Sequence, residues 1–400
     1  MLAGEAVPQT AEDPDSLSPP PAHRRRPGKN RYDLAELAGA FGDLGTLIPF
    51  VVGYITVMKI DALGIFFMFG MSAIVAGWYY RTPIPVQPMK VIGGAAIAAG
   101  GAISPGVVCG AGLFTGVFWL VAGATGTVNV VTAVATKPVV RGILLGLGVS
   151  FMTQGIVLMG TTPWLAAVGL GLTYALLTHR KFPAMFALLL VGTAAALWMQ
   201  PSLEAFVLSL RPAFRLPHVA LSGMTWQQFV EGSIVLAIPQ IPLTIGNAVI
   251  AMREENNLLF PDRPVTARML AVSQGLINLA AAPLGGIPMC HGSGGMAGHV
   301  RFGARTGGSL VIFGFMLVIL ALFFSGSAGI LFGAFPKAVL GVILFFAGGE
   351  LALTVRDIGS QRDDVYVMVV VAAFAMWNMG AAFLVGVLLH QALQRGWARL

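Results

Sequence analysis

The run TPIPVQPMK at residues 82–90 interrupts sequence that is otherwise almost continuously apolar. Its three prolines, Pro83, Pro85 and Pro88, hold the backbone extended and disfavour helix in the residue before each of them. Pro88 also suits the first turn of a helix that would continue through residues 89–99. We therefore predict a short strand followed by a short helix. About eleven residues at ~1.5 Å each cover only half of a bilayer core, so this helix would begin near the middle of a membrane.

Lys90 lies in the first turn of this predicted helix, where its positive charge opposes the helix dipole. A lysine buried in a membrane is costly unless an anion lies beside it. One interpretation is a functional cation at an anion-binding site. The alternative is that Lys90 extends to the membrane surface, or pairs with a carboxylate on another helix. Because Lys90 violates a local rule at a backbone interruption, the functional interpretation is favoured.

The composition indicates a membrane protein that crosses the bilayer many times. Of 400 residues, 56% are hydrophobic and 10% are charged, and the mean hydropathy is +0.81. The net charge of +7 comes mostly from short loops, so it reports orientation in the membrane and requires no nucleic-acid partner. The two cysteines suggest no disulfide framework. We expect a single all-α integral membrane domain.

Hydropathy predicts fourteen transmembrane segments, two of them broken. We place them at residues 33–57, 61–80, 83–100 (broken), 104–123, 128–157, 162–178, 182–199, 226–252, 265–283, 285–300 (broken), 307–325, 327–354, 363–378 and 380–396. Residues 1–32 are predicted to be a disordered cytoplasmic tail and residues 200–225 an extracytoplasmic linker, and no soluble C-terminal domain is expected. The distribution of Lys and Arg puts both termini on the cytoplasmic side of the cell membrane.

Three short motifs recur in the same order on the two sides of the linker, about 200 residues apart. The matched pairs are Thr46 with Thr244, Pro85 with Pro288, and Gly142 with Gly341. A repeat of seven segments must enter the membrane upside down relative to its partner, because seven is odd. Residues 33–199 and 226–396 are therefore predicted to form a seven-plus-seven inverted repeat.

The second broken segment contains GGIPMCHGSGG at residues 285–295. In inverted-repeat transporters, paired broken helices point their N-termini at an anionic substrate. Glycine allows close backbone approach, so successive N–H groups here could form an anion-binding nest. The alternative is that these glycines only pack helices closely. Two helix ends of roughly +0.5 each and Lys90 would together offer about +2, which suits a divalent oxyanion.

Several other polar residues fall at or near the two interruptions. The predicted substrate-binding residues are Thr46, Gln87, Lys90, Gln240, Thr244, His291, Gly292, Ser293 and Gly294, with Asn247 nearby. Their amides and hydroxyls could donate to oxyanion oxygens, or could instead form hydrogen bonds between helices. His291 could bind substrate or titrate, or it could be a structural histidine. No catalytic residue, metal or cofactor is expected.

Two acids in the first segment, Glu36 and Asp43, are candidates for carrying a coupling proton. They are seven residues apart and so lie on one face of a helix. Asp43 could also pair with Lys90 in the empty site, or cap the helix that follows it. Glu36 lies closer to the membrane edge, where it could be an interface residue.

Four motifs resemble the MOT1-type molybdate transporters, which are relatives of the sulfate permeases. They are GDLGT at residues 42–46, PVQPMK at 85–90, PMCHGSGGMAG at 288–298 and RFGART at 301–306. The resemblance implies fourteen spans, with a core domain of spans 1–4 and 8–11 and a gate domain of spans 5–7 and 12–14. It also implies uptake of molybdate. It does not identify which motif residues contact the substrate.

The sequence thus predicts a secondary active transporter that imports molybdate by alternating access, with proton coupling as an addition. One alternative is the same fold carrying sulfate or tungstate, and another is a passive anion channel. An intramembrane hydrolase using Ser293 and His299 is disfavoured, because the full nucleophile-elbow pattern is missing. The expected partners are molybdate or a similar oxyanion and the lipid bilayer, without nucleic acid, and a homodimer is compatible with such a fold.

Overall fold

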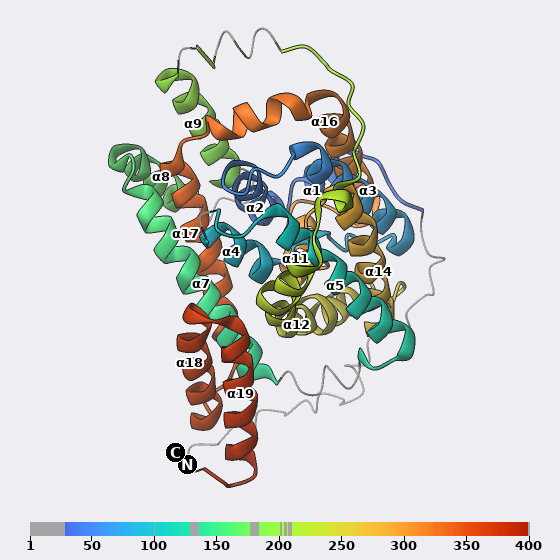
Figure 1. Ribbon diagram of the computed structural model, residues 1–400, viewed down its shortest axis with the longest axis vertical. Helices are drawn as coiled ribbons and strands as arrows, with labels where there is room; N and C mark the ends of the chain where they lie inside the picture. The colour runs from blue at the N-terminus through green and yellow to red at the C-terminus, as the bar shows by residue number, and fades with distance from the viewer. Residues whose placement is uncertain are drawn as a thin grey trace, which may run out of the picture.

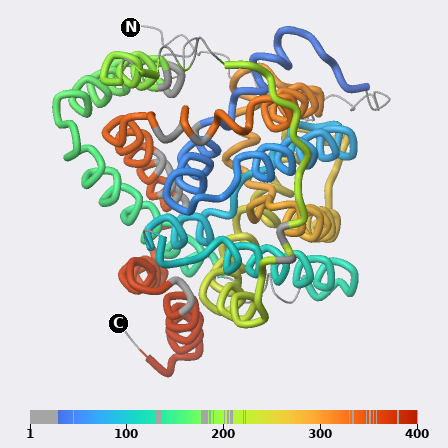
Figure 2. The backbone as a smooth tube through the Cα atoms, turned by 45° about the horizontal axis from the view of Figure 1, so that its top comes forward, coloured from blue at the N-terminus to red at the C-terminus, as the bar shows by residue number. Residues whose placement is uncertain are grey.

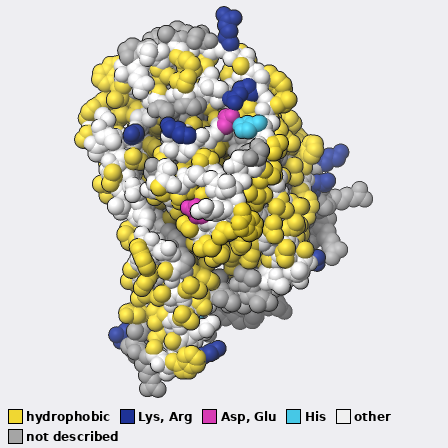
Figure 3. All heavy atoms as spheres, viewed as in Figure 1, with side chains coloured by type: hydrophobic (Ala, Val, Ile, Leu, Met, Phe, Trp, Pro, Cys, Tyr) yellow, Lys and Arg dark blue, Asp and Glu magenta, His cyan; other side chains and the backbone are white. Residues whose placement is uncertain are grey.

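The structure is a computed structural model, which describes residues 29–99, 101–128, 136–176, 184–200, 202–203, 206 and 210–398. Within these residues nearly all regular structure is helical, and five helices are long and apolar enough to cross a membrane. Hydrophobic side chains predominate on the face shown in Figure 3, where charged side chains are few and scattered. The chain is therefore a mostly helical membrane protein. Most of the predicted N-terminal tail lies outside the described residues.

The first half of the chain contains two short helices, one short strand and a series of longer helices. They are α1 (Leu34–Ala40), α2 (Leu44–Thr56), α3 (Ala62–Tyr80), β1 (Gln87–Pro88), α4 (Lys90–Ala98), α5 (Pro105–Thr125), α7 (Lys137–Met159), α8 (Pro163–Leu176) and α9 (Ala184–Met199). Local sequence explains several of their ends. Asp61 accepts a hydrogen bond from the N–H of Leu63 at the start of α3, and Ser104 caps α5 in the same way.

The second half repeats this succession after a short 3₁₀ turn, η2 (Ala220–Gly223). Its first long helix is continuous but changes type along its length: α11 (Trp226–Glu231), η3 (Gly232–Ala237), α12 (Ile238–Leu243), η4 (Thr244–Ala251) and α13 (Met252–Leu259), of which η3 and η4 are π-helical. Then follow α14 (Ala267–Ala281), η5 (Ala282–Leu284), β2 (Met289–Cys290), α15 (Ser293–Arg301), α16 (Gly308–Gly333), α17 (Lys337–Leu353), η6 (Thr354–Asp357), α18 (Arg362–Trp377) and α19 (Met379–Gln394).

Two predicted boundaries were wrong. Pro88 does not begin the first short helix, because it lies in β1 and the helix begins at Lys90. A proline fits a strand of only two residues, where few ladder hydrogen bonds are needed. The later boundary near residue 326 is also misplaced, since α16 continues to Gly333 and α17 begins after Pro336. Glycines inside a membrane helix did not end it, whereas the proline marks the true junction.

The helices fall into two groups. In Figure 1, α7, α8, α9, α17, α18 and α19 form an elongated group along one side, and the remaining labelled helices form a rounder body beside it. Figure 2 shows the same separation from a second direction. Glycines bring α7 and α17 into close contact, because a Cβ on Gly155 would lie 2.6 Å from the carbonyl oxygen of Gly341, and the reverse distance is also 2.6 Å. Larger residues there would force the two helices apart.

Packing between the two halves of the chain occurs in matched pairs. In the rounder body α3 packs along α16, and α5 packs along α14. In the elongated group α18 packs on α7, and α8 packs on α17. By their order in the chain, α14 and α16 are the counterparts of α3 and α5, and α17 and α18 are the counterparts of α7 and α8. Each contact in a pair is therefore the other contact with the two halves of the chain exchanged.

The two interrupted segments meet each other at the strands. β1 and β2 are antiparallel, with Gln87 opposite Cys290 and Pro88 opposite Met289. Asn278 of α14 holds β2 in place, because its Nδ2 donates to the carbonyl oxygen of Met289 at 2.7 Å and its Oδ1 accepts from the same residue's N–H at 2.8 Å. Each strand is followed by a helix of nine residues, α4 or α15. Such a helix covers roughly 14 Å, about half of a bilayer core.

Candidate functional site

The N-terminus of α4 is closed by a side chain from the other half of the chain. Gln240 of α12 is buried, and its Oε1 accepts hydrogen bonds from the N–H groups of Val91 at 2.8 Å and Ile92 at 3.3 Å. Its Nε2 donates to Thr244 Oγ1 at 3.0 Å. These contacts agree with the alternative interpretation of Gln240 and Thr244 as residues that bond helices together. Gln240 Oε1 is thereby engaged, whereas the hydroxyl of Thr244 accepts from Gln240 and has no acceptor for its own O–H among the described contacts.

The N-terminus of α15 is open. Gly292 occupies the N-cap position in extended conformation and provides no capping side chain. Among the described residues, the N–H groups of Ser293 and Gly294 have no hydrogen-bond acceptor outside their helix. A Cβ on Gly294 would meet no other atom within 4 Å, so open space adjoins this first turn. Free N–H groups at a helix N-terminus make a ready site for an anion.

Gln87 lies between this open end and Asp43. Its side chain is fully buried, and its Nε2 donates to both carboxylate oxygens of Asp43 at 2.7 Å, with Thr46 Oγ1 farther away at 3.4 Å. A carboxylate only accepts hydrogen bonds, so the amide nitrogen must face Asp43. Gln87 Oε1 therefore faces the other way, against Gly292, where it has no donor among the described contacts. This buried and unpartnered oxygen is aimed at the start of α15.

Asp43 does not act as a helix cap. It occupies the N-cap position of α2, but its side chain makes no capping hydrogen bond and is directed at Gln87 instead. A Cβ on Gly295 would lie 2.6 Å from Asp43 Oδ2, so the carboxylate lies against the first turn of α15. The capping interpretation of Asp43 was thus wrong, because the N–H groups of Thr46 and Leu47 bond to the backbone carbonyl oxygen of Asp43 and the carboxylate bonds to Gln87.

Lys90 is buried, with 8% of its surface exposed, and makes no hydrogen bond or ion pair with the described residues. The direct pairing with Asp43 that we considered is not observed. Asp43 and Cys290 nevertheless lie close enough to interact with its ammonium electrostatically. A buried cation without a partner is costly, and an anionic guest would remove that cost.

Asn247 is a further polar residue at this site. It lies in the π-helical stretch η4, and its Oδ1 accepts a hydrogen bond from Ser293 Oγ at 3.1 Å. Its Nδ2 is therefore turned the other way and lies near Gly292, 3.1 Å from the position of an added Cβ. π-Helical stretches occur often at functional sites. The sequence signal for Asn247 is an amide inside an apolar span, near the interruptions and able to donate to an oxyanion.

His291 is held on both sides of its ring. Nδ1 lies 2.9 Å from the carbonyl oxygen of Pro85, and Nε2 lies 2.7 Å from Ser273 Oγ. A carbonyl can only accept, so Nδ1 carries a proton. The Ser273 hydroxyl bonded to Nε2 also lies 3.1 Å from the carbonyl oxygen of Leu270. Tyr80 completes the chain with its hydroxyl 2.5 Å from Ser273 Oγ. This arrangement agrees with the structural alternative for His291.

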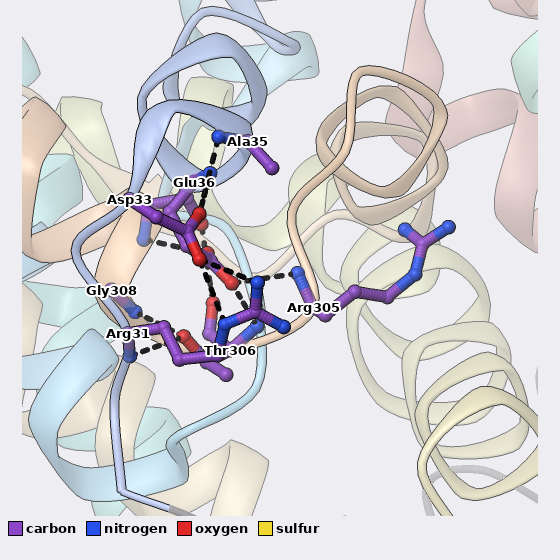
Figure 4. Close-up of polar contacts among 8 residues, drawn as sticks. Arg31, Asp33, Ala35, Glu36, Arg305, Thr306 and Gly308 are labelled. Carbon is purple, nitrogen blue, oxygen red and sulfur yellow. Dashed lines mark hydrogen bonds and ion pairs between the residues drawn. The ribbon is translucent and has the colours of Figure 1, made fainter.

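Glu36 is engaged away from the two helix ends (Figure 4). Its Oε1 accepts from the N–H groups of Arg305 at 3.0 Å and Thr306 at 2.9 Å, and its Oε2 accepts from Ser309 N–H at 3.1 Å. The side chain is almost completely buried within the protein. The three N–H donors fasten this carboxylate, and with it α1, to the loop after α15 and to the start of α16.

The site as a whole offers N–H groups, amides and one ammonium. In the described part of the chain, no group of three or more His, Cys, Asp or Glu side chains could hold a metal ion. Ser293 Oγ donates to Asn247, while His299 Nδ1 is bonded to the carbonyl oxygen of Gly39. These groups can bind an oxyanion by hydrogen bonds and charge, and Ser293 and His299 make no hydrogen bond with each other, as the nucleophile and base of a hydrolase would.

The chain is similar over most of its length to known molybdate transporters. A sequence model of the family described as "Molybdate transporter of MFS superfamily" matches residues 35–151 and 232–351. Molybdate transporter 2 of Arabidopsis thaliana is 33% identical, over 90% of this chain and 87% of that protein. Molybdate transporter 1 of Chlamydomonas reinhardtii is 28% identical, over 88% of this chain and 90% of its own.

Two solved anion-transporter structures share the fold. One is the transmembrane domain of a cyanobacterium bicarbonate transporter, BicA, with a TM-score of 0.62 and 15% identity, covering 90% of this chain and 98% of that one. The other is murine Solute Carrier 26 family member A9 in the inward-facing state, with a TM-score of 0.67 and 13% identity, covering 93% and 70%. The family match and the identity to its plant relative show that this chain belongs to the molybdate transporter family.

Proposed function

We propose that this protein is a secondary active transporter that imports molybdate across the cell membrane. The observation that carries the proposal is the open first turn of α15, against which the unpartnered Gln87 Oε1 lies. The buried Lys90, which makes no ion pair with the described residues, adds a positive charge near Asp43 and Cys290. The molybdate transporters to which the chain is related support this choice of oxyanion. The family is one of transporters, so the protein is not an enzyme and the hydrolase alternative is set aside.

Charge favours coupling of a proton through Asp43. Two helix ends of roughly +0.5 each and Lys90 amount to about +2, and an ionised Asp43 lowers this to about +1. Protonation of Asp43 would restore the charge that balances a divalent anion. Glu36 is less suited to this role, because its carboxylate oxygens are already occupied by three backbone N–H groups. We therefore assign the coupling proton to Asp43.

Gln87 links that proton to the anion. While Asp43 is ionised, its carboxylate occupies the donor end of the Gln87 carboxamide and leaves Oε1 facing α15. An acceptor in that position repels an oxyanion. Once protonated, Asp43 can donate to Oε1, so the carboxamide reverses and presents its NH₂ group to the guest. Proton binding and oxyanion binding then favour each other.

Alternating access would move the two helix groups relative to one another. The site lies close to their boundary, because Gly94 of α4 packs on Phe151 of α7, whose ring lies 5.6 Å from that of Phe50. We take the rounder body as the core domain and the elongated group as the gate domain. Fourteen spans in two inverted repeats are supported by the exchanged packing pairs and by two family-matched blocks offset by about 200 residues. The distribution of Lys and Arg in the loops supports cytoplasmic termini.

The test is uptake of molybdate into proteoliposomes that contain the purified protein. An inward proton gradient should accelerate uptake, and Asp43→Asn should remove this acceleration while leaving saturable exchange of molybdate. Competition with sulfate and tungstate, measured in the same vesicles, decides which tetrahedral dianion binds best. Preference for sulfate over molybdate would contradict the substrate assignment. Indifference of the wild-type protein to the gradient would remove Asp43 from coupling.

A further inference from the structure

The protein has a cavity that plays no part in the proposed transport. It has a volume of about 770 Å³ and lies between α3 and α14, which are both labelled on the right of Figure 1. Most of its wall is apolar. Phe67, Met71 and Val75 contribute from α3, and Val272, Leu276 and Ala280 contribute from α14. The two helices thus form an apolar groove, which we call the α3–α14 groove.

The groove is open along one side. Its rim consists of exposed side chains, among them Val75, Tyr79 and Leu276, which is 53% exposed. Its floor is buried and includes Ser72 and Ala76. α3 is one of the helices long and apolar enough to span a membrane, so the open side faces lipid rather than water. An apolar groove at this depth suits an acyl chain.

Three polar side chains of the floor are hydrogen-bonded in a series within the protein, and among the described contacts the Ser72 hydroxyl makes no hydrogen bond. The hydroxyl of Tyr80 bonds to Ser273, and the Ser273 hydroxyl bonds to Nε2 of His291. Nδ1 of His291 bonds to the carbonyl oxygen of Pro85. An occupant therefore finds no free hydrogen-bonding partner along this chain and must be apolar over most of its length.

One end of the groove is positively charged. Arg268 lines this end at the start of α14. One of its N–H groups donates to the carbonyl oxygen of Ala124 at 3.0 Å, and the rest of its guanidinium is exposed. Arg81 follows the last residue of α3 and is also exposed. Burial and the nearby Arg81 lower the pKa of Arg263, which places that residue close to the same end. Neither Arg81 nor Arg268 has an acidic partner among the described ion pairs.

The length of the groove matches one leaflet of a bilayer. From Arg268 to Ala280 the axis of α14 rises roughly 18 Å, and half of the hydrocarbon core measures about 15 Å. A phosphate placed at the arginine end therefore lies at the membrane surface. An acyl chain attached to it would reach the inner end of the groove near Leu284.

We propose that the α3–α14 groove binds one anionic glycerophospholipid, with an acyl chain along the groove and the phosphate at Arg268 and Arg81. The bound chain packs on the floor beside His291, which in turn holds Pro85 next to the strand crossing. The lipid thereby supports the two interrupted segments from behind the transport site. This proposal does not depend on which anion is transported.

Native mass spectrometry of the purified protein tests it, with phosphatidylglycerol and phosphatidylcholine of identical acyl chains added in equal amounts. The wild-type protein should retain one phosphatidylglycerol at least about five-fold better than phosphatidylcholine, because phosphatidylglycerol carries a net negative charge, phosphatidylcholine is zwitterionic, and each arginine near an anionic headgroup contributes roughly that factor. Arg268→Ala combined with Arg81→Ala should remove the preference. Arg356→Ala, on the exposed turn η6, is the matched control and should keep it.

A second variant tests the groove itself. Ala280→Phe fills it from an exposed position, where the larger side chain needs no repacking of the core, and should remove retention of both lipids. Ala373→Phe, at an exposed position of α18, is the control for added bulk and should leave retention unchanged. Equal retention of the two lipids by the wild-type protein would overturn the proposal. So would a loss of lipid in the control variants as large as in the test variants, or a wild-type protein dimer that carries no lipid.

Discussion

The first turns of α4 and α15 are built alike but are used differently. Both follow a strand of two residues, both helices have nine residues, and their strands pair with each other. At α4, Gln240 Oε1 takes the N–H groups of Val91 and Ile92. At α15, the described residues leave the N–H groups of Ser293 and Gly294 without an acceptor outside the helix. One helix end is closed by the protein, and the other remains open.

This difference shows that a short interrupted helix can contribute a side chain to an anion site while its backbone N–H groups are bonded elsewhere. α4 supplies the ammonium of Lys90, while α15 supplies N–H groups. The closed end also explains how a helix that begins in the middle of a membrane is stable without a guest. Its orphan donors would otherwise be buried and unsatisfied. The open end is left for the guest to satisfy.

Lys90→Ala should have the largest effect, because it removes the charge that α4 contributes. We expect molybdate to bind about 100-fold more weakly, since a hydrogen bond to a charged group contributes up to ~3 kcal/mol. Equilibrium binding of labelled molybdate to purified protein measures this, and Lys90→Arg should retain part of the affinity. Lys59→Ala, an exposed lysine, is the control. Wild-type affinity in the Lys90→Ala protein would remove this residue from the site.

Glu36→Ala should test whether the attachment of α1 to the segment after α15 matters as much as the open N-terminus of α15. Three backbone N–H groups lose their acceptor, so we expect the free energy of unfolding to fall by about 3 kcal/mol. Thermal unfolding in detergent measures this loss. Asp33→Ala is the comparison, since it removes an exposed cap of α1 and should cost only about 1 kcal/mol. If instead Glu36→Ala unfolds normally but loses proton-driven uptake, the coupling proton belongs to Glu36.

Gly294→Ala should separate binding from stability at the open end. The added methyl group points into open space and alanine favours helix, so the melting temperature should not fall. If the guest occupies that space, molybdate binding should weaken about ten-fold, the cost of ~1.4 kcal/mol for an imperfect fit. Gly349→Ala, also without neighbours within 4 Å, is the matched control in α17. Unchanged affinity would place the guest elsewhere.

Gln240→Ala should have the smallest effect on binding, because this side chain serves the closed end. Loss of the cap should cost about 1 to 2 kcal/mol of stability, and affinity for molybdate should change less than three-fold. Thermal unfolding and equilibrium binding on the same samples measure both quantities. Gln154→Ala, at an exposed position of α7, is the control. A loss of affinity as large as that of Lys90→Ala would mean that α4 is not closed when the guest binds.

Much of the fold follows from local sequence. Prolines at 83, 85 and 88 predicted a strand and a half-length helix, because proline restricts its own backbone and that of the preceding residue wherever it occurs. Hydropathy likewise predicted most helices to within a few residues, since the cost of polar backbone in lipid depends on the segment alone. The wrong boundary near residue 326 came from glycines, whose effect depends on what packs against them.

The roles of individual polar side chains could not be obtained in this way. Gln240 and Val91 are separated by 149 positions in the chain, and Glu36 and Thr306 by 270. The sequence marked these residues as polar groups in apolar surroundings, each of which needs some partner. Which partner each one meets depends on how the helices pack, because an amide or carboxylate bonds whatever donor or acceptor the fold brings within about 3 Å.

By itself, the sequence determined that this is a membrane protein with two interrupted segments and a buried cation beside one of them. These features depend on hydropathy, proline geometry and charge, which act over a few residues. Tertiary packing decided that the two interruptions meet, that Gln240 closes α4, and that α15 stays open beside Gln87. The physical reason is the distance along the chain between the interacting groups. A hydrogen bond is specific only once both of its partners are in place, and here the partners come from opposite halves of the chain.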